Sequence, residues 1–104
     1  MPTNRERVLE LLWDSVEALN ALQPPDHQLV KDPETRLVGP DAGIDSLALV
    51  QLISELETRI EDAAGVTIAL ADERAMSQSR SPFRTLGTLA DYAATLLDEA
   101  AKGG

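Results

Sequence analysis

The sequence contains no cysteine and only one histidine in 104 residues. The lack of cysteine excludes disulfides, thiolate metal sites and cysteine nucleophiles, and a single histidine excludes a histidine-rich metal centre. No apolar run approaches the roughly 20 residues of a membrane-spanning helix. Residues Met1 to Asn4 do not open a secretory signal. We therefore expect a soluble, cytoplasmic protein.

Basic residues are also scarce, since nine of them stand against eighteen acidic residues and the net charge is −9. Residues 41–73 carry most of the excess, with eight acidic residues and a single basic one, Arg59. The phosphates of nucleic acids and of anionic membranes repel such a chain, whereas a basic protein surface attracts it. The composition favours basic proteins as partners.

The length and an apolar fraction of 43% suit a single domain over residues 1–104. Apolar periodicity predicts three long helices, at about 4–22, 46–63 and 86–101. Their apolar stripes are Val8, Leu12, Val16, Leu19 and Leu22; Leu47, Val50, Ile53, Leu56 and Ile60; and Leu89, Tyr92, Leu96, Leu97 and Ala100. The predicted fold is all-α, a small helical bundle, with a short fourth helix possible in 71–84.

Capping and stop signals stand near the expected helix ends. The predicted caps are Thr3 with Glu6, Asp45, and Thr88 with Asp91, and the predicted stops are Pro24-Pro25 and Gly65. Residues 23–45 lack periodicity and form a long loop, which we expect Leu29, Val30, Leu37 and Val38 to anchor to the core. Residues 66–70 are expected to form an extended connector.

The sequence offers no recognisable catalytic machinery. A serine nucleophile needs a base, and the only histidine, His27, lies in a polar loop where we expect it to be solvated. Ser46 lacks the glycine pattern of a nucleophile elbow, and Asp41 and Asp45 lack calcium-loop spacing. We predict no enzyme, no catalytic residue and no metal site.

Ser46 remains distinctive because it stands at a predicted helix start, where free backbone N–H groups suit a phosphate. Around it, residues 43–47 (Gly-Ile-Asp-Ser-Leu), Val50, Leu52 and Leu56-Glu57 form one block. Residues 65–68 (Gly-Val-Thr-Ile) form a second, and residues 83–89 (Phe-Arg-Thr-Leu-Gly-Thr-Leu) a third. In this order the blocks resemble the acyl carrier protein family, the phosphopantetheine-bearing carriers of fatty-acid, polyketide and nonribosomal-peptide systems.

The resemblance implies that a phosphopantetheinyl transferase attaches 4′-phosphopantetheine from coenzyme A to Ser46, using magnesium of its own. The arm's thiol then holds an acyl group as a thioester, and partner enzymes act on it in trans. It also implies partner and transferase recognition by Asp45, Leu47, Val50, Gln51, Glu55 and Glu57. Candidates for lining an acyl pocket are Val50, Ile53, Leu56, Ile68, Phe83, Leu89 and Tyr92, expected to pack with Leu12, Val16 and Leu96.

Departures from the family pattern indicate a specialised carrier, which we expect to be free-standing and monomeric. Ala48 and Gln51 stand where fatty-acid-synthase carriers usually have acidic residues on the exposed helix face, and Thr58-Arg59 interrupts the usual acidic run. Residues 61–64 add about one turn, and Gly65 to Thr85 is longer than usual. The expected partner is a dedicated ligase or acyltransferase.

Two alternatives stay open. One is a carrier for an amino or aryl acid loaded by an adenylating ligase, although such carriers often have Gly-Gly before the serine segment. The other is an unmodified acidic helical adaptor that binds a basic protein.

Overall fold

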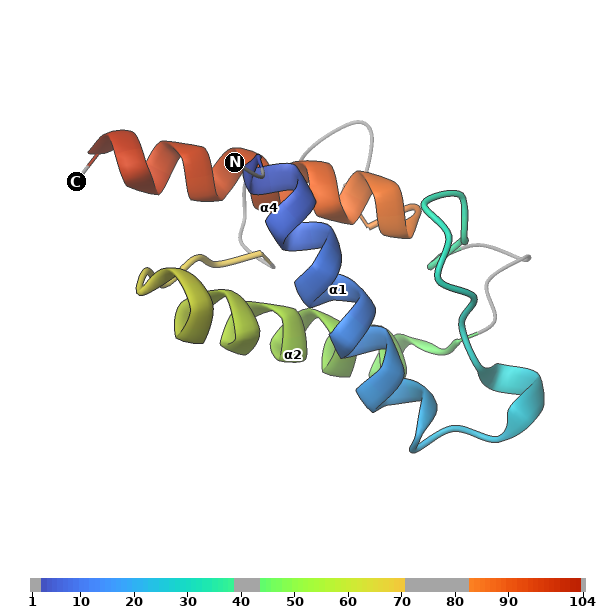
Figure 1. Cartoon of the computed structure of the whole chain (residues 1–104). Coiled ribbons are helices and arrows are strands. Elements are labelled where there is room, and N and C mark those ends of the chain that lie inside the picture. Colours follow the sequence, from blue (N-terminus) through green and yellow to red (C-terminus); the bar gives the residue numbers. More distant parts are fainter. Residues whose placement is uncertain (1–2, 39–43, 71–82, 104) are drawn as a thin grey trace.

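The computed structural model describes residues 3–38, 44–70 and 83–103, without the side chains of Ser46 and residues 101–103. Three long helices are present: α1 (Asn4–Asn20), α2 (Ser46–Ala64) and α4 (Leu86–Gly103), with one 3₁₀ turn at Pro25–His27 (Figure 1). Within these ranges the only β-type pairing is an isolated bridge between Arg36 and Thr85. The all-helical prediction is confirmed. The short helix expected in 71–84 lies outside the described residues apart from 83–84, which are not helical.

Helix α1 begins as its capping signal predicts. The Thr3 hydroxyl Oγ1 accepts a hydrogen bond from the Glu6 amide at 3.1 Å, and every buried side chain of α1 lies on one face. The helix ends at Asn20, two residues earlier than predicted. Leu22 therefore lies beyond the helix with 75% of its surface exposed, and its place in the predicted apolar stripe is wrong.

Helix α2 is capped by Asp45, whose carboxylate accepts a hydrogen bond from the Ala48 amide at 2.8 Å, and it ends at Ala64 with Gly65 as its C-terminal cap. Gly65 has φ +73°, a left-handed backbone conformation that residues other than glycine adopt only at a cost in free energy. Both ends are as predicted, to within one residue.

The buried face of α2, however, differs from the predicted stripe. Leu47 and Val50 are 68% and 58% exposed, whereas Ala48, Leu52, Leu56 and Ile60 are buried. A helix has about 3.6 residues per turn, so each step of three falls short of a full turn and three such steps lead from Leu47, on the solvent side, to Leu56, on the core side. Steps of four from Ala48 stay on it.

Helix α4 starts with a reciprocal cap between two threonines. The Thr88 amide donates to Thr85 Oγ1 at 3.1 Å, and the Thr85 amide donates to Thr88 Oγ1 at 3.0 Å. The predicted capping box of Thr88 with Asp91 is therefore wrong by one turn, because Thr88 already lies inside the helix. Asp91 instead accepts a hydrogen bond from Arg5 Nε at 2.6 Å and ties α4 to α1.

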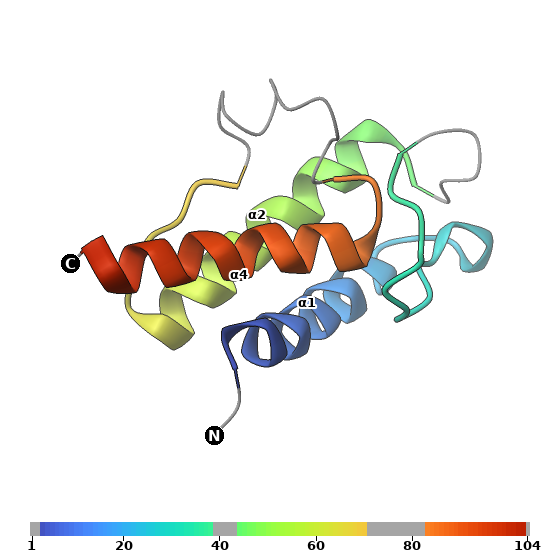
Figure 2. The ribbon, with the colours of Figure 1, turned by 90° about the horizontal axis from the view of Figure 1, so that it is seen from above.

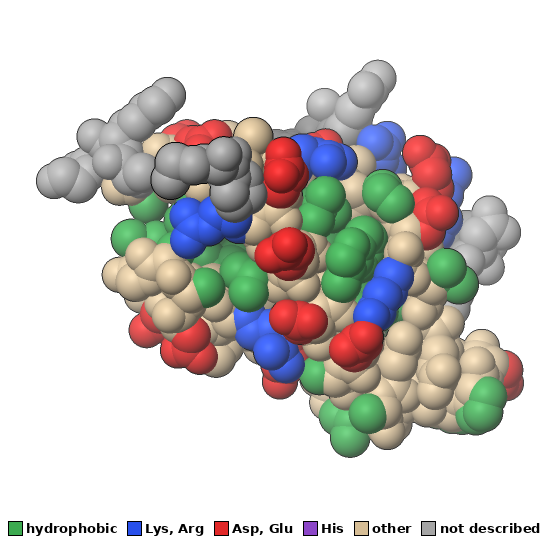
Figure 3. Space-filling model, viewed as in Figure 1, with side chains coloured by type: hydrophobic (Ala, Val, Ile, Leu, Met, Phe, Trp, Pro, Cys, Tyr) green, Lys and Arg blue, Asp and Glu red, His purple; other side chains and the backbone are tan. Residues whose placement is uncertain are grey.

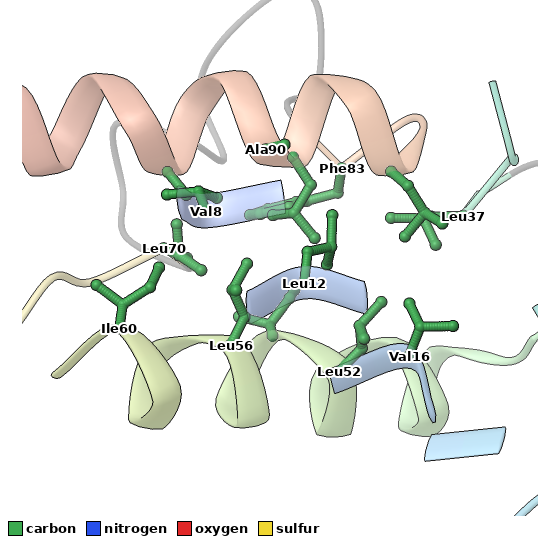
Figure 4. Packing of buried hydrophobic residues seen from close by; sticks show 14 of the residues in the cluster. Val8, Leu12, Val16, Leu37, Leu52, Leu56, Ile60, Leu70, Phe83 and Ala90 are labelled. Carbon is green, nitrogen blue, oxygen red and sulfur yellow. The ribbon is translucent and has the colours of Figure 1, made fainter. Parts of the chain in front are cut away.

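Helix α1 lies across α2 and α4 and packs against both (Figures 1 and 2). The side chains between the three helices form one hydrophobic core, to which the loop adds Leu37 and the connector adds Leu70 (Figure 4). Of the predicted core residues, Leu12, Val16, Ile53, Leu56, Ile68, Phe83 and Leu89 are buried, Tyr92 and Leu96 are partly buried against them, and Val50 is outside.

The loop after α1 is anchored by its backbone as well as by apolar side chains. Leu29 and Leu37 are buried as predicted, but Val30 and Val38 are exposed, and their predicted anchoring role is wrong. Successive residues of an extended segment point to opposite sides, so each pair can bury only one member. The Asn20 side chain bonds both the amide and the carbonyl of Leu29, at 2.8 and 2.9 Å.

A second loop anchor lies at the start of α4. The Gly87 amide donates to the Pro33 carbonyl at 2.8 Å, and the Leu86 amide donates to the Thr35 carbonyl at 3.0 Å. A Cβ atom on Gly87 would lie 2.9 Å from the Pro33 carbonyl oxygen, so this close approach requires glycine. The loop therefore satisfies amides that the helix start leaves free.

Candidate functional site

The candidate site is the beginning of α2. Ser46 is the first residue of the helix, directly after the capping residue Asp45, which is exposed. Ile44, two residues before Ser46, is buried and joins the core, whereas Leu47 points to solvent. The chain therefore enters the helix from a buried anchor and emerges at the surface within three residues. Gly43, the first residue of the sequence block, lies outside the described residues.

The other serines differ from Ser46 in their surroundings. Ser15 is buried in α1, and its hydroxyl donates to the Leu11 carbonyl at 2.9 Å, so no enzyme can reach it. Ser54 is exposed two turns into α2. The remaining serines, at positions 77, 79 and 81, lie outside the described residues. Within the described part of the chain, Ser46 is the only serine at the first position of a helix.

A strip along the outward face of α2 is uncharged from Leu47 to Thr58, with the exposed Glu55 at its edge. Leu47, Val50, Gln51, Ser54 and Thr58 all lie on this face and are exposed. Two of them are large apolar side chains, which water solvates poorly. This uncharged α2 face begins beside Ser46 and is open to a partner.

Two carboxylates predicted to recognise partners already have partners within the chain. Glu55 Oε2 lies 3.5 Å from Arg59 Nε, one helical turn away. Glu57 Oε2 accepts a hydrogen bond from the Leu70 amide at 2.7 Å and fixes the connector to α2. The first pairing dilutes the acidic character beside the uncharged α2 face, and the second gives Glu57 a structural task.

Ala48 does not lie on the exposed face, contrary to the sequence-based expectation. Its surface is 2% exposed because it packs in the core one turn before Leu52. The missing acidic residue at this position therefore reflects burial. Gln51, by contrast, is exposed as expected.

The predicted pocket residues separate into two groups. Ile53, Leu56, Ile68, Phe83 and Leu89 are buried in the common core, with Tyr92 at its edge. Val50 was expected among them but is exposed on the opposite face of α2. A surface groove of about 400 Å³ lies where the connector meets α2, and it is lined by Ile68 together with Ser54, Glu57, Thr58, Glu61 and Thr67.

The sequence analysis missed an acidic face on α1. Glu6, Glu10, Asp14 and Glu17 recur at spacings of four, four and three, and all are exposed. Figure 3 shows acidic side chains that follow the course of α1, with hydrophobic ones on both sides. Their helical spacing is visible in the sequence and places all four on one side of the helix expected at 4–22. Glu17 also pairs with Lys31.

Among the described residues, none of the helices is long and apolar enough to cross a membrane. The same residues hold no group of three or more acidic or histidine side chains suited to a metal ion. His27 is exposed and lies 3.8 Å from the Asp26 carboxylate.

Comparison with known proteins adds no relative. No family model, curated protein or solved structure matches this chain.

Proposed function

We propose that this chain is a carrier protein that is modified on Ser46 with 4′-phosphopantetheine and presents acyl groups to partner enzymes. The observation that carries the proposal is the position of Ser46 as the first residue of a long surface helix, capped by Asp45 and followed by the exposed Leu47 and Val50. The sequence blocks that resemble acyl carrier proteins supply the family context.

The local structure is compatible with a phosphodiester on Ser46. The Asp45 carboxylate takes the Ala48 amide, and the helix start leaves the amides of Ser46 and Leu47 without intrahelical partners. These amides and the helix dipole favour a negative group by about 0.3–1 kcal/mol at a surface site. Because Asp45 and Leu47 are exposed, a transferase can approach the serine from solvent.

Each residue near Ser46 has a distinct part in this proposal. When bound, the arm supplies a thiol that carries an acyl group as a thioester. Asp45 fixes the helix start and offers the transferase a carboxylate, while Leu47 and Val50 give partner enzymes an apolar contact. The chain itself performs no bond-making chemistry, because its serine is the acceptor of a group that another enzyme transfers.

The uncharged α2 face favours partners other than housekeeping fatty-acid-synthase enzymes. Those enzymes are expected to dock through basic patches, and basic side chains gain little from Gln51, Ser54 and Thr58. A dedicated ligase or acyltransferase with an apolar docking surface suits this face better. Loading by a purified synthase should therefore be slow, and Gln51→Glu should raise it most at low salt.

Intact-mass measurement tests the modification. The full chain is incubated with coenzyme A, magnesium and a broad-specificity phosphopantetheinyl transferase. We expect a gain of one phosphopantetheine for the native chain and for Ser54→Ala, the matched control on the same helix, and no gain for Ser46→Ala. A correctly folded native chain that gains no mass, or a gain that persists in Ser46→Ala, would contradict the proposal.

The same experiment separates the alternatives. An unmodified adaptor would show no gain with any transferase. A carrier for amino or aryl acids would gain the arm and then accept its cargo from an adenylating ligase in the presence of ATP, whereas an acyl carrier would accept fatty acyl groups. The second mass shift identifies the cargo class.

A further inference from the structure

A second surface feature lies between α1 and α2, above the core residue Leu19. Side chains of both helices, together with Leu22 just after α1, line an open groove of about 290 Å³. We call it the α1–α2 groove; its main lining residues are Leu19, Leu22, Val50, Gln51, Ser54 and Glu55. This volume is comparable to one or two large apolar side chains, so the groove can hold an anchor residue of another protein.

Half of the residues that line the α1–α2 groove are apolar, and two of these are strongly exposed. Leu22 and Val50 come from different segments and line the same groove, and both are more than half exposed. Two large aliphatic side chains held in this way have apolar surface to bury, and covering them contributes about 25 cal/mol for each Å² removed from water. The groove is thus favourable for a complementary apolar side chain.

Carboxylates predominate on the α1 side of the groove, although Lys31 pairs with Glu17 and Arg7 is exposed on the same helix. Asp14 lies one helical turn before Ala18, which also lines the groove, and it belongs to the acidic face of α1 with Glu6, Glu10 and Glu17. On the α2 side, Glu55 lines the groove and shares its charge with Arg59. A segment seated in the groove therefore meets an acidic surface on its α1 side.

We propose that the α1–α2 groove binds a basic amphipathic helix of a partner protein, with an apolar side chain between Leu22 and Val50 and lysines or arginines facing the acidic face of α1. The apolar walls define the anchor, and the acidic face defines the charge of its flanks. The interaction does not depend on modification of Ser46.

Charge argues against a second copy of the chain as the occupant. Each copy has a net charge of −9, so pairing through this surface would bring acidic faces together. A basic helix has the opposite charge and gains from the same field.

The test uses three peptide probes against the full-length Ser46→Ala chain, in which modification is impossible. The first is an amphipathic helical peptide of leucine and lysine, the second has glutamate for every lysine, and the third keeps the lysines but has serine for every leucine. Amide chemical-shift mapping locates the binding, and fluorescence anisotropy gives Kd. We expect tight binding only for the first peptide, with shifts at Ala18, Leu19, Leu22, Val50 and Ser54.

Matched variants assign the two parts of the surface. Leu22→Ser with Val50→Ser should raise Kd at least about tenfold, while Val30→Ser, an equally exposed site elsewhere, should change it less than about twofold. Glu10→Gln with Asp14→Asn should weaken binding at low salt and lose that effect at high salt, and Glu61→Gln with Asp62→Asn serves as the charge control. Thermal unfolding confirms that each variant is folded.

Several outcomes would overturn the proposal. They are shifts centred away from the groove, equal binding of the glutamate or serine peptide, and an equal effect of Val30→Ser. Concentration-dependent dimerisation through the groove, seen by sedimentation, would also reject it in favour of a second copy. None of these results bears on Ser46, so the carrier proposal stands or falls separately on the mass measurement.

Discussion

Helices α1 and α2 bury their inner faces in the same core but present opposite chemistry to solvent. The outward face of α1 carries an acidic residue at nearly every turn, from Glu6 to Glu17. On α2 an uncharged strip runs from Leu47 to Thr58 with only Glu55 at its edge, although α2 belongs to the most acidic third of the sequence. Charge counted along a sequence therefore does not locate charge on a surface.

The difference arises from how α2 uses its carboxylates. Asp45 caps the helix, Glu55 pairs with Arg59, and Glu57 holds the Leu70 amide. On α1, by contrast, the side chains of Glu10 and Asp14 are exposed. The carboxylates of Asp45, Glu55 and Glu57 thus serve the fold, whereas those of Glu10 and Asp14 remain available to attract another protein.

The largest expected effect contrasts the two faces of α2. Leu56→Ala should lower the free energy of unfolding by about 2–5 kcal/mol, because Leu56 is fully buried and the truncation leaves a cavity. Val50→Ala, on the outward face, should change it by less than about 0.5 kcal/mol. Urea unfolding followed by circular dichroism measures both. Equal losses would mean that the helix is rotated from the orientation described.

Substitutions that add one carboxylate sharpen the same contrast. Ala48→Asp should lower stability by about 1–3 kcal/mol, and by more while the new carboxyl is ionised, because Ala48 is buried. Gln51→Glu adds the same charge at an exposed position and should be nearly neutral. Thermal unfolding of the two variants provides the comparison, and a stable Ala48→Asp chain would place that residue at the surface.

A pair of glutamate-to-alanine variants compares α2 with α1 directly. Glu57→Ala removes the acceptor of the Leu70 amide and should lower stability by about 1.5–3 kcal/mol, typical of a hydrogen bond to a charged group. Glu10→Ala gives the same gain in helix propensity without losing a bond, and should be neutral or slightly stabilising. Amide hydrogen exchange at Leu70 should rise only in Glu57→Ala; unchanged protection would show that Glu57 does not hold the connector.

The smallest stability effect, with the clearest functional consequence, concerns Asp45. Asp45→Ala should cost about 0.5–2 kcal/mol through loss of the cap, whereas Asp45→Asn keeps a capping side chain and should cost little. If the transferase contacts the Asp45 carboxylate, Ser46 should be modified more slowly in both variants under conditions where both are folded. Normal turnover of Asp45→Asn would limit Asp45 to its capping role.

Much of this protein follows from local sequence. The three helices, the Thr3 and Asp45 caps and the Gly65 stop are as predicted, because periodicity and capping depend on residues within one or two turns. Ser46 as the first residue of a helix was predicted on the same basis. Its modification remains a prediction, which the mass measurement tests.

Rotation of α2 and the course of the loop depended on the tertiary structure. Residues 47–53 contain apolar side chains on nearly every side, so periodicity alone allowed either Leu47 and Val50 or Ala48 and Leu52 to face inward. Packing against α1 decided it, because the core accepts the four-residue repeat that continues to Leu56 and Ile60.

Long-range contacts decided the rest. Thr85, not Thr88, caps α4 because the loop meets the helix start there. The loop does so through the carbonyls of Pro33 and Thr35, which lie about fifty residues earlier in the sequence. The exposed faces of α1 and α2, on which the partner proposals rest, depend on packing in the same way. Sequence determined which segments are helical, and packing between distant segments decided which side chains they leave to solvent.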